Sequence, residues 1–243
     1  MAERIFCEKT KIWCIFSWSL VLGLSTLSSV VFVPSSFFSN AENILNVLFV
    51  KWAWGWTLYS LFPAVVLVSW ALRDDFRQNS IRAILKIGVF GTLVWFLGTQ
   101  FTFKLGDLTG TCRDANFSAV SSYATKRLCR SNGHTWDHFD ISGHTFLLSW
   151  CIYLTIAELF YPAREFFKRT HSFILEVLTV LAIAWNFLLV LLWLVMLVAT
   201  QLYFHTFAEK VLAKLLCDVF FIFYRLAGDL VNRLLPLSKA KNY

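Results

Sequence analysis

Charged residues are scarce in this sequence, at only 15% of its 243 residues, whereas 58% of the residues are hydrophobic. A soluble domain carries about one-quarter charged residues. Too few polar side chains remain to cover a soluble globule of this size, so lipid must face much of the surface. The formal net charge of +7 is explained better by membrane orientation and anionic headgroups than by nucleic acid. We expect an integral membrane protein with no nucleic-acid partner.

Several motifs are also missing. The six cysteines include no Cys-x-x-Cys pair, which leaves metal and redox motifs without support. The first apolar segment is too long for a signal-peptide core and lacks a clear small-x-small cleavage site, so we expect it to remain as a first span. No internal repeat or paired broken helix supports a transporter. The sequence requires no cofactor, and it leaves a need for a divalent metal open.

Six segments predict membrane spans, because a crossing helix needs about 20 mostly apolar residues. They form one all-α domain over residues 1–243, with spans at about 12–33, 50–72, 81–101, 143–161, 173–202 and 207–230. The last span is the least apolar. Its charged residues recur near helical spacing: Lys210, Lys214, Asp218, Arg225 and Asp229. We expect this charged face to turn inward or toward water, with i,i+4 pairs along it.

Basic residues in the short loops predict the orientation of the spans. An arrangement with both ends in the cytosol places most of the short basic segments there and leaves the lumenal loop 34–46 without a basic residue. The long loop 102–141 is then lumenal, although it is basic. It carries Lys104, Arg113, Lys126, Arg127 and Arg130. Two interpretations fit: a long loop tolerates these charges, or they are held for an anionic substrate.

Three short features agree with a lumenal loop in the endoplasmic reticulum. Asn116-Phe117-Ser118 is an N-glycosylation sequon. Cys112 and Cys129 lie in the same loop and are candidates for a disulfide, which needs an oxidising compartment. Lys239 and Lys241, near the C-terminus, resemble the cytosolic dilysine signal that retrieval machinery reads.

Two histidines are predicted to meet at one membrane surface, since His144 opens the fourth span and His205 closes the fifth. Ser142 or Asp140 can cap the helix that begins near Gly143. The free N–H groups of that helix form an anion site, and the glycine lets a phosphate approach the backbone. His144 would then lie on the first turn, where it can donate a proton to a leaving oxygen.

His205 is followed at i+4 by Glu209, whose carboxylate can orient the imidazole as a nucleophile or base. Lys210 adds a cation beside it. His134 and His171 are expected to be ordinary loop residues, as is His138, although His138 could approach the site.

Ser142-Gly143-His144 with the later His205-x-x-x-Glu209 resembles the lipid phosphate phosphatase superfamily. That resemblance implies that the second histidine attacks phosphorus and the first protonates the leaving group. The superfamily's Lys and Arg-Pro motif is absent, and Ala199 stands where an arginine would precede the nucleophile. Phosphate contacts must then come from other cations. The candidates are Lys210, Arg127 and Arg130, together with Lys104, Arg113 and Lys126.

A narrower resemblance covers nearly the whole chain. The stretch from Trp136 to Leu148, which contains Phe-Asp-Ile-Ser-Gly-His, resembles the signature of the fat storage-inducing transmembrane (FIT) proteins. Residues 203–205 followed by Glu209-Lys210-Val211, and residues 109–112, resemble two further elements. In that family glutamine can replace the acid at position 209, so the resemblance does not require a carboxylate there.

The resemblance implies a protein of the endoplasmic reticulum membrane that supports lipid-droplet formation. It also implies a lumenal diphosphatase that cleaves fatty acyl-CoA to acyl-4′-phosphopantetheine and adenosine 3′,5′-bisphosphate, with acyl-CoA and membrane lipids as partners. The alternative is a non-catalytic scaffold that binds neutral lipid. A scaffold would not need two histidines at one surface.

Overall fold

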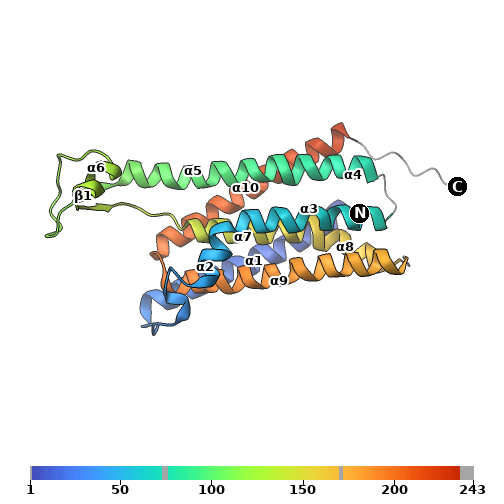
Figure 1. The fold of residues 1–243 in the computed structure, drawn as a ribbon, viewed down its shortest axis with the longest axis horizontal. Helices are drawn as coiled ribbons and strands as arrows, with labels where there is room; N and C mark the ends of the chain where they lie inside the picture. Colours follow the sequence, from blue (N-terminus) through green and yellow to red (C-terminus); the bar gives the residue numbers. More distant parts are fainter. Residues whose placement is uncertain (1, 73–75, 170–171, 236–243) are drawn as a thin grey trace.

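The computed structural model describes residues 2–72, 76–169 and 172–235. Within these residues, long helices form six rods that lie side by side and alternate in direction (Figure 1). The rods are α1 (Ala2–Val30), α3 (Ala53–Ala71), the continuous α4, η3 and α5 (Phe76–Ala83, Ile84–Gly91, Thr92–Thr109), the continuous α7, η4 and α8 (Gly143–Thr155, Ile156–Phe160, Tyr161–Phe166), α9 (Phe173–Tyr203) and α10 (Phe207–Leu234).

The long loop 110–142 lies at one end of the bundle, which we call the loop end. The short elements η1 (Phe37–Ser39), α2 (Ile44–Leu48) and η2 (Val50–Trp52) join α1 to α3 at the same end. The start of α1 and the last turn of α10 lie together at the opposite end (Figure 1).

Five of the rods are long and apolar enough to cross a membrane. They cover Trp13–Val30, Ile44–Ala71, Arg77–Thr109, Gly143–Phe166 and Phe173–Tyr203. The chain is thus an all-α transmembrane protein. The sixth rod, α10, has 28 residues, but its charges keep it outside the same apolar class. The third rod continues to Thr109, past the predicted end at residue 101.

The charged face of α10 turns into the bundle, as its spacing predicts. Lys214 is fully buried, and its Nζ donates to Tyr153 Oη at 2.7 Å and to Asp218 Oδ1 at 2.5 Å. Trp18 Nε1 donates to the other Asp218 oxygen at 2.6 Å. The opposite face of α10 exposes its apolar residues, namely Leu212, Leu215, Val219, Ile222, Phe223 and Leu226. Internal partners therefore satisfy Lys214 and Asp218, while apolar side chains lie on the outer face of the bundle.

Helix α7 forms the centre of the bundle and packs against α3, α5, α9 and α10. Phe146, Leu148 and Trp150 on it are fully buried. Helix α5 approaches α7 closely at Gly98, where an added Cβ would overlap the ring of Phe146. A residue without a side chain is needed at that crossing.

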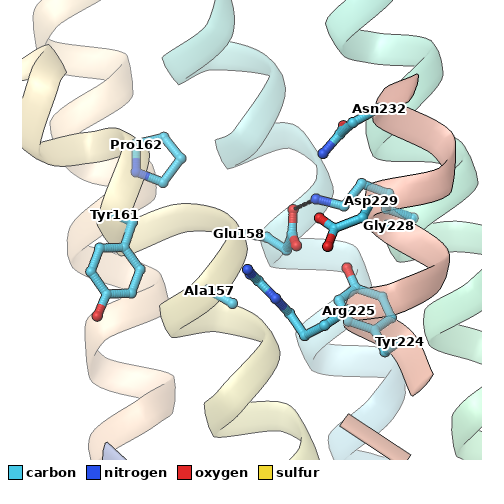
Figure 2. Close-up of a pocket in the computed structure, with 10 residues that line it drawn as sticks. Ala157, Glu158, Tyr161, Pro162, Tyr224, Arg225, Gly228, Asp229 and Asn232 are labelled. Atoms are coloured by element: carbon cyan, nitrogen blue, oxygen red, sulfur yellow. Dashed lines mark hydrogen bonds and ion pairs between the residues drawn. The ribbon is translucent and has the colours of Figure 1, made fainter. Parts of the chain in front are cut away.

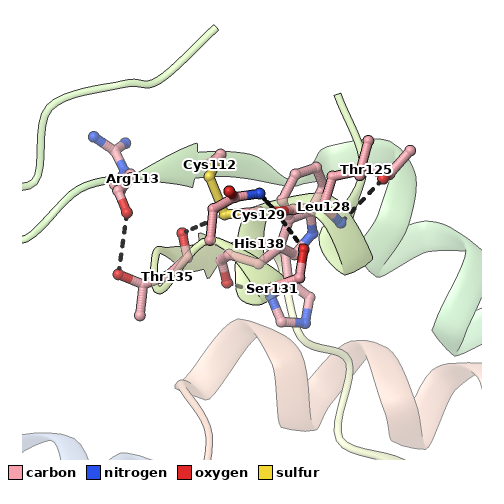
Figure 3. Close-up of a disulfide and its surroundings, with 10 residues drawn as sticks. Cys112, Arg113, Thr125, Leu128, Cys129, Ser131, Thr135 and His138 are labelled. Carbon is pink, nitrogen blue, oxygen red and sulfur yellow. Dashed lines mark hydrogen bonds between the residues drawn. A yellow bond between two sulfur atoms is a disulfide. The ribbon is translucent and has the colours of Figure 1, made fainter. Parts of the chain in front are cut away.

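A small disulfide-bonded hairpin covers part of the loop end. Strand β1 (Thr111–Arg113) pairs antiparallel with β2 (Thr135–Asp137), with Cys112 opposite Trp136. Helix α6 (Lys126–Ser131) brings Cys129 beside Cys112, and the two form a disulfide with Cα atoms 5.6 Å apart (Figure 3). The predicted disulfide is confirmed. Trp136 Nε1 donates to Gly106 O at 3.3 Å and so ties the hairpin to the end of α5.

We predict that Gly98→Ala lowers the stability by about 1–3 kcal/mol, because the new methyl group overpacks the contact with Phe146. Thermal unfolding of the detergent-purified protein measures this effect. Gly55→Ala is the matched control, since an added Cβ at Gly55 has no heavy atom within 4 Å. Equal melting temperatures for the two variants would contradict the close approach of α5 and α7.

Candidate active site

His205 lies in the tight turn that joins α9 to α10. Its φ of 59° places it in the left-handed region, which non-glycine residues rarely adopt. A capping box follows it: Glu209 Oε2 accepts from Thr206 N at 2.8 Å, and Thr206 Oγ1 accepts from Glu209 N at 3.5 Å. The Thr-x-x-Glu pattern is visible in the sequence, but our sequence analysis missed it. This cap starts α10 directly after the strained histidine.

Two carboxylates face the same nitrogen of His205. Nδ1 lies 3.7 Å from Asp140 Oδ2 and 3.8 Å from Glu209 Oε2. These distances are within the range of an ion pair but are longer than a hydrogen bond. Catalytic hydrogen bonds are often this long in unliganded sites and tighten with substrate. With Nδ1 directed at the acids, Nε2 is the nitrogen that remains for attack or proton transfer.

Glu209 also joins the two segments of the site. Its Oε1 accepts from Asp140 N at 2.8 Å, and its backbone oxygen accepts from Ser142 N at 3.3 Å. The carboxylate is 11% exposed, so these bonds are shielded from water. The glutamate therefore orients His205 and, at the same time, holds the start of α7 against the start of α10.

His144 sits on the first turn of α7, as predicted. Ser142 is the helix cap, and its Oγ accepts from Thr145 N at 3.2 Å. His144 Nε2 lies 3.0 Å from Asn46 Oδ1 on α2. Asn46 Nδ2 donates to Ala41 O at 2.6 Å, which directs Oδ1 toward the histidine. The His144 proton is thus assigned to Nε2, and Nδ1 is the basic nitrogen.

Asp140 lies between two histidines. Its second oxygen is 3.6 Å from His138 Nε2, while His138 Nδ1 lies 3.1 Å from Trp136 O. The His138 ring packs closely on Gly106, where a Cβ would be 2.7 Å from it. His138 therefore reaches the site through Asp140. The Asp140 side chain is 59% exposed, which keeps this side of the site open.

The structure corrects the prediction for Lys210. Its side chain turns away from the histidines into the bundle, where it is 2% exposed. Nζ donates to Gln201 O at 2.7 Å and to Ser28 Oγ at 3.1 Å. Carbonyls in the last turn of a helix lack intrahelical donors, and the lysine supplies one at the end of α9. Lys210 is a structural cation in this packing and not a substrate contact.

Beneath the site, Gln201 links three helices. Its Nε2 donates to Thr145 Oγ1 at 2.9 Å on α7, and its Oε1 accepts from Ser25 Oγ at 3.0 Å on α1. Nothing in the local sequence around Gln201 or Asn46 distinguishes these two residues. Sequence reasoning missed both, since each acts through a partner far along the chain.

The other predicted residues are spread over the loop end. Arg127 and Arg130 line a cavity of about 450 Å³ on the hairpin, together with Lys126, Asp107 and Trp136. Among the described contacts, none joins a residue of this cavity directly to His144 or His205; Trp136 is linked to His205 through His138 and Asp140. Asn116 is exposed in a turn.

At Gly143 an added Cβ would meet no atom within 4 Å, so the backbone there is open. Within the described ranges, His, Cys, Asp and Glu form no group of three suited to a metal.

These contacts suit acid–base and nucleophilic chemistry. The site combines an imidazole oriented by carboxylates, a second imidazole oriented by an amide, and an open helix start. Asp140, which faces His205, lies on the segment that leads directly into α7 and His144. A phosphate held at the start of α7 would have a nucleophile or base on one element and a proton donor on another.

We predict that His205→Gly leaves the melting temperature unchanged or raises it, although it removes the imidazole. His205 adopts a left-handed conformation, which costs a residue with a side chain about 1 kcal/mol and which glycine adopts without that cost. The control is Phe204→Gly, at a φ of −126°, where glycine relieves nothing and should lower stability. If His205→Gly were the more destabilising of the two, the histidine would serve the fold more than the chemistry.

Comparison with known proteins agrees with the earlier resemblance. The family model described as fat storage-inducing transmembrane protein matches residues 34–184. A relative from Xenopus tropicalis, named acyl-coenzyme A diphosphatase FITM2, is 34% identical over 79% of this chain and 73% of its own. Relatives of the same name from Danio rerio (35% identical, 77% of this chain, 72% of its own) and Homo sapiens (31%, 82% and 76%) also match. No solved structure matches. The chain belongs to the fat storage-inducing transmembrane protein family.

Proposed function

We propose that this chain is an acyl-coenzyme A diphosphatase of the endoplasmic reticulum membrane, which supports lipid-droplet formation. The observation that carries the proposal is the pair of oriented imidazoles at one end of the bundle, His144 held by Asn46 and His205 beside Asp140 and Glu209. The curated relatives that carry this activity in their names support it.

The proposed reaction adds water across the diphosphate of fatty acyl-CoA. His205 Nε2 attacks one phosphorus, and the bridging P–O bond breaks. In the complex, the anionic diphosphate favours a proton on both nitrogens of His144, which gives its Nδ1 proton to the leaving phosphate oxygen. Water then attacks the phosphorus of the phosphohistidine at His205, and His144 Nδ1 takes a proton from that water. The products are acyl-4′-phosphopantetheine and adenosine 3′,5′-bisphosphate. Asp140 and Glu209 stabilise the positive charge that develops on the His205 ring.

The start of α7 is suited to hold the anionic centre. The cap at Ser142 leaves backbone N–H groups of the first turn directed outward, and Gly143 leaves space for close approach. Charge stabilisation of this kind is often the largest single contribution to catalysis. Arg127 and Arg130 remain proposed contacts for the distal phosphates of the substrate, whereas Lys210 no longer does.

The membrane position of the site suits an acylated substrate. The acyl chain can remain in the bilayer while the diphosphate reaches the bundle end. We propose six spans with α10 as the sixth, both ends in the cytosol, and the histidines and hairpin in the lumen. The disulfide and the exposed Asn116 sequon support that orientation. Lys239 and Lys241, the proposed retrieval signal, lie outside the described residues.

We predict that His144→Ala and His205→Ala each lower acyl-CoA hydrolysis about 100-fold or more, as loss of general acid–base or nucleophilic groups does. The assay follows release of adenosine 3′,5′-bisphosphate by the purified protein, with and without a chelator to settle metal dependence. His134→Ala is the matched control, because this loop histidine contacts Tyr123 and not the site. Equal turnover by all four proteins would favour the neutral-lipid scaffold over the enzyme.

A second prediction concerns orientation. Asn116→Gln should remove an N-linked glycan, seen as a faster-migrating band, because Asn116 is exposed on the proposed lumenal loop. A tag at the C-terminus should be cut by protease added to intact microsomes. A protected tag, or glycan transfer to a sequon placed in the loop before α9, would overturn this arrangement.

A further inference from the structure

The cavity on the disulfide-bonded hairpin, which we call the hairpin cavity, carries an excess of positive charge. It has a volume of about 450 Å³. Three cations, Lys126, Arg127 and Arg130, line it together with one acid, Asp107, and with Trp136. Three cations against one carboxylate leave two positive charges in excess.

The three cations have no internal partner. Within the part of the chain that the structure describes, no hydrogen bond or ion pair joins a side-chain nitrogen of Lys126, Arg127 or Arg130 to another residue. The polar cavity between η3, the η4–α8 segment and α10 differs, because Lys86 there lies 2.6 Å from Glu158 (Figure 2). The cations of the hairpin cavity can therefore bind an anion without first giving up an ion pair.

Helix α6 holds these cations close together although they repel each other. Lys126 and Arg130 are i,i+4 neighbours on this helix, a spacing at which like charges are destabilising. The helix is fixed by Cys129, which is fully buried and bonded to Cys112 (Figure 3). An anion bound between the cations would offset the repulsion that the hairpin imposes on them.

The hairpin cavity and the histidines share the loop end of the bundle. Trp136, which lines the cavity, places its backbone oxygen 3.1 Å from His138 Nδ1. His138 Nε2 lies 3.6 Å from Asp140 Oδ1, and Asp140 Oδ2 lies 3.7 Å from His205 Nδ1. Trp136 and Asp140 are four residues apart in the sequence, so their Cα atoms are at most about 14 Å apart. The two arginines of α6 are exposed and not held by another residue, so their side chains can extend toward an elongated ligand at the histidines.

We propose that the hairpin cavity binds the 3′-phosphate of the coenzyme A part of the substrate, an inference that rests on the proposed function. A phosphomonoester carries a charge of about −1.5 to −2 at pH 7 and has three acceptor oxygens. This charge matches the two positive charges in excess, whereas each phosphate of the diphosphate bridge carries only one. Arg127 and Arg130 can each bind such a phosphate through two parallel hydrogen bonds.

A nucleotide phosphate suits this position better than a lipid headgroup does. Phosphatidic acid also ends in a phosphomonoester, so the chemistry of the phosphate alone does not separate the two sources. Helix α6 and strand β1, however, lie beyond the ends of α7 and α10 (Figure 1). The cavity is thus displaced from the apolar rods along which acyl chains would lie.

Isothermal titration calorimetry of the full chain in detergent tests the proposal without requiring turnover. The ligands are adenosine 3′,5′-bisphosphate, adenosine 5′-monophosphate, inorganic phosphate and dioctanoyl phosphatidic acid. The bisphosphate should bind about tenfold more tightly than the monophosphate, because the charged hydrogen bonds to its 3′-phosphate are added. Arg127→Gln and Arg130→Gln should each weaken binding of the bisphosphate about tenfold and reduce this preference. Arg77→Gln, which removes an exposed arginine from α4, is the matched control and should leave the affinities unchanged.

Hydrolysis adds a second measurement. Wild type should prefer fatty acyl-CoA over fatty acyl-dephospho-CoA, which lacks only the 3′-phosphate, by about tenfold in kcat/KM. The ratio should fall toward one in Arg127→Gln and Arg130→Gln. If wild type hydrolyses neither substrate, the proposed function fails, while the calorimetry still decides whether the cavity recognises the 3′-phosphate.

Three outcomes would overturn the proposal and leave the hydrolase standing. The first is equal binding of the bisphosphate and the monophosphate. The second is binding of the bisphosphate that is indifferent to both arginine variants. The third is tighter binding of inorganic phosphate or dioctanoyl phosphatidic acid than of the bisphosphate, which would assign the cavity to a free anion or to a lipid.

Discussion

The rotation of α10 about its own axis is the constraint on which the rest of the structure depends. This helix carries charged side chains through most of its length, and turning them to lipid would cost several kcal/mol each. Lys214 instead bonds Tyr153 and Asp218, and Trp18 bonds the same aspartate. These contacts attach α10 to both α1 and α7. The apolar face, including Phe223 and Leu226, is then exposed on the outside of the bundle.

The same rotation assembles the histidine site. Once the charged face of α10 meets α7, Glu209 at its start faces Asp140 and Ser142, and it bonds the backbone of both. Lys210, one residue further on, is carried inward to the end of α9. Only a short turn connects α9 to α10, and His205 takes a left-handed conformation within it. Strain of this kind persists only where surrounding contacts hold it, and here the capping box and the Asp140 segment do so.

The two ends of the bundle differ in their electrostatics. At the loop end, carboxylates surround His205, and an open helix start lies nearby, which suits a reaction that moves protons and phosphate. At the opposite end, Lys86, Arg225, Glu158 and Asp229 line one cavity in equal numbers of either sign, and Lys86 pairs with Glu158. The buried Lys214 network lies between them and has all its charges paired internally. One helix, α10, contributes to all three regions.

The sequence by itself determined the features that depend on local spacing. Apolar length predicted the long rods, the i,i+4 spacing predicted the Lys214–Asp218 pair, and the capping position of Ser142 was correct. The presence of Cys112 and Cys129 in one loop predicted the disulfide between them. Each of these follows from residues that are neighbours in the sequence or confined to one loop.

Only the tertiary structure decided what depends on how the helices pack. Lys210 adjoins the site in sequence, yet the inward face of α10 buries it against Gln201 and Ser28. Asn46 orients His144 from a helix far away in the sequence, and Asp140 joins His138 to His205 across the loop end. No local pattern encodes these contacts. They arise because desolvated charges and polar atoms must find partners, and the partners available are set by the rotation and crossing of whole helices.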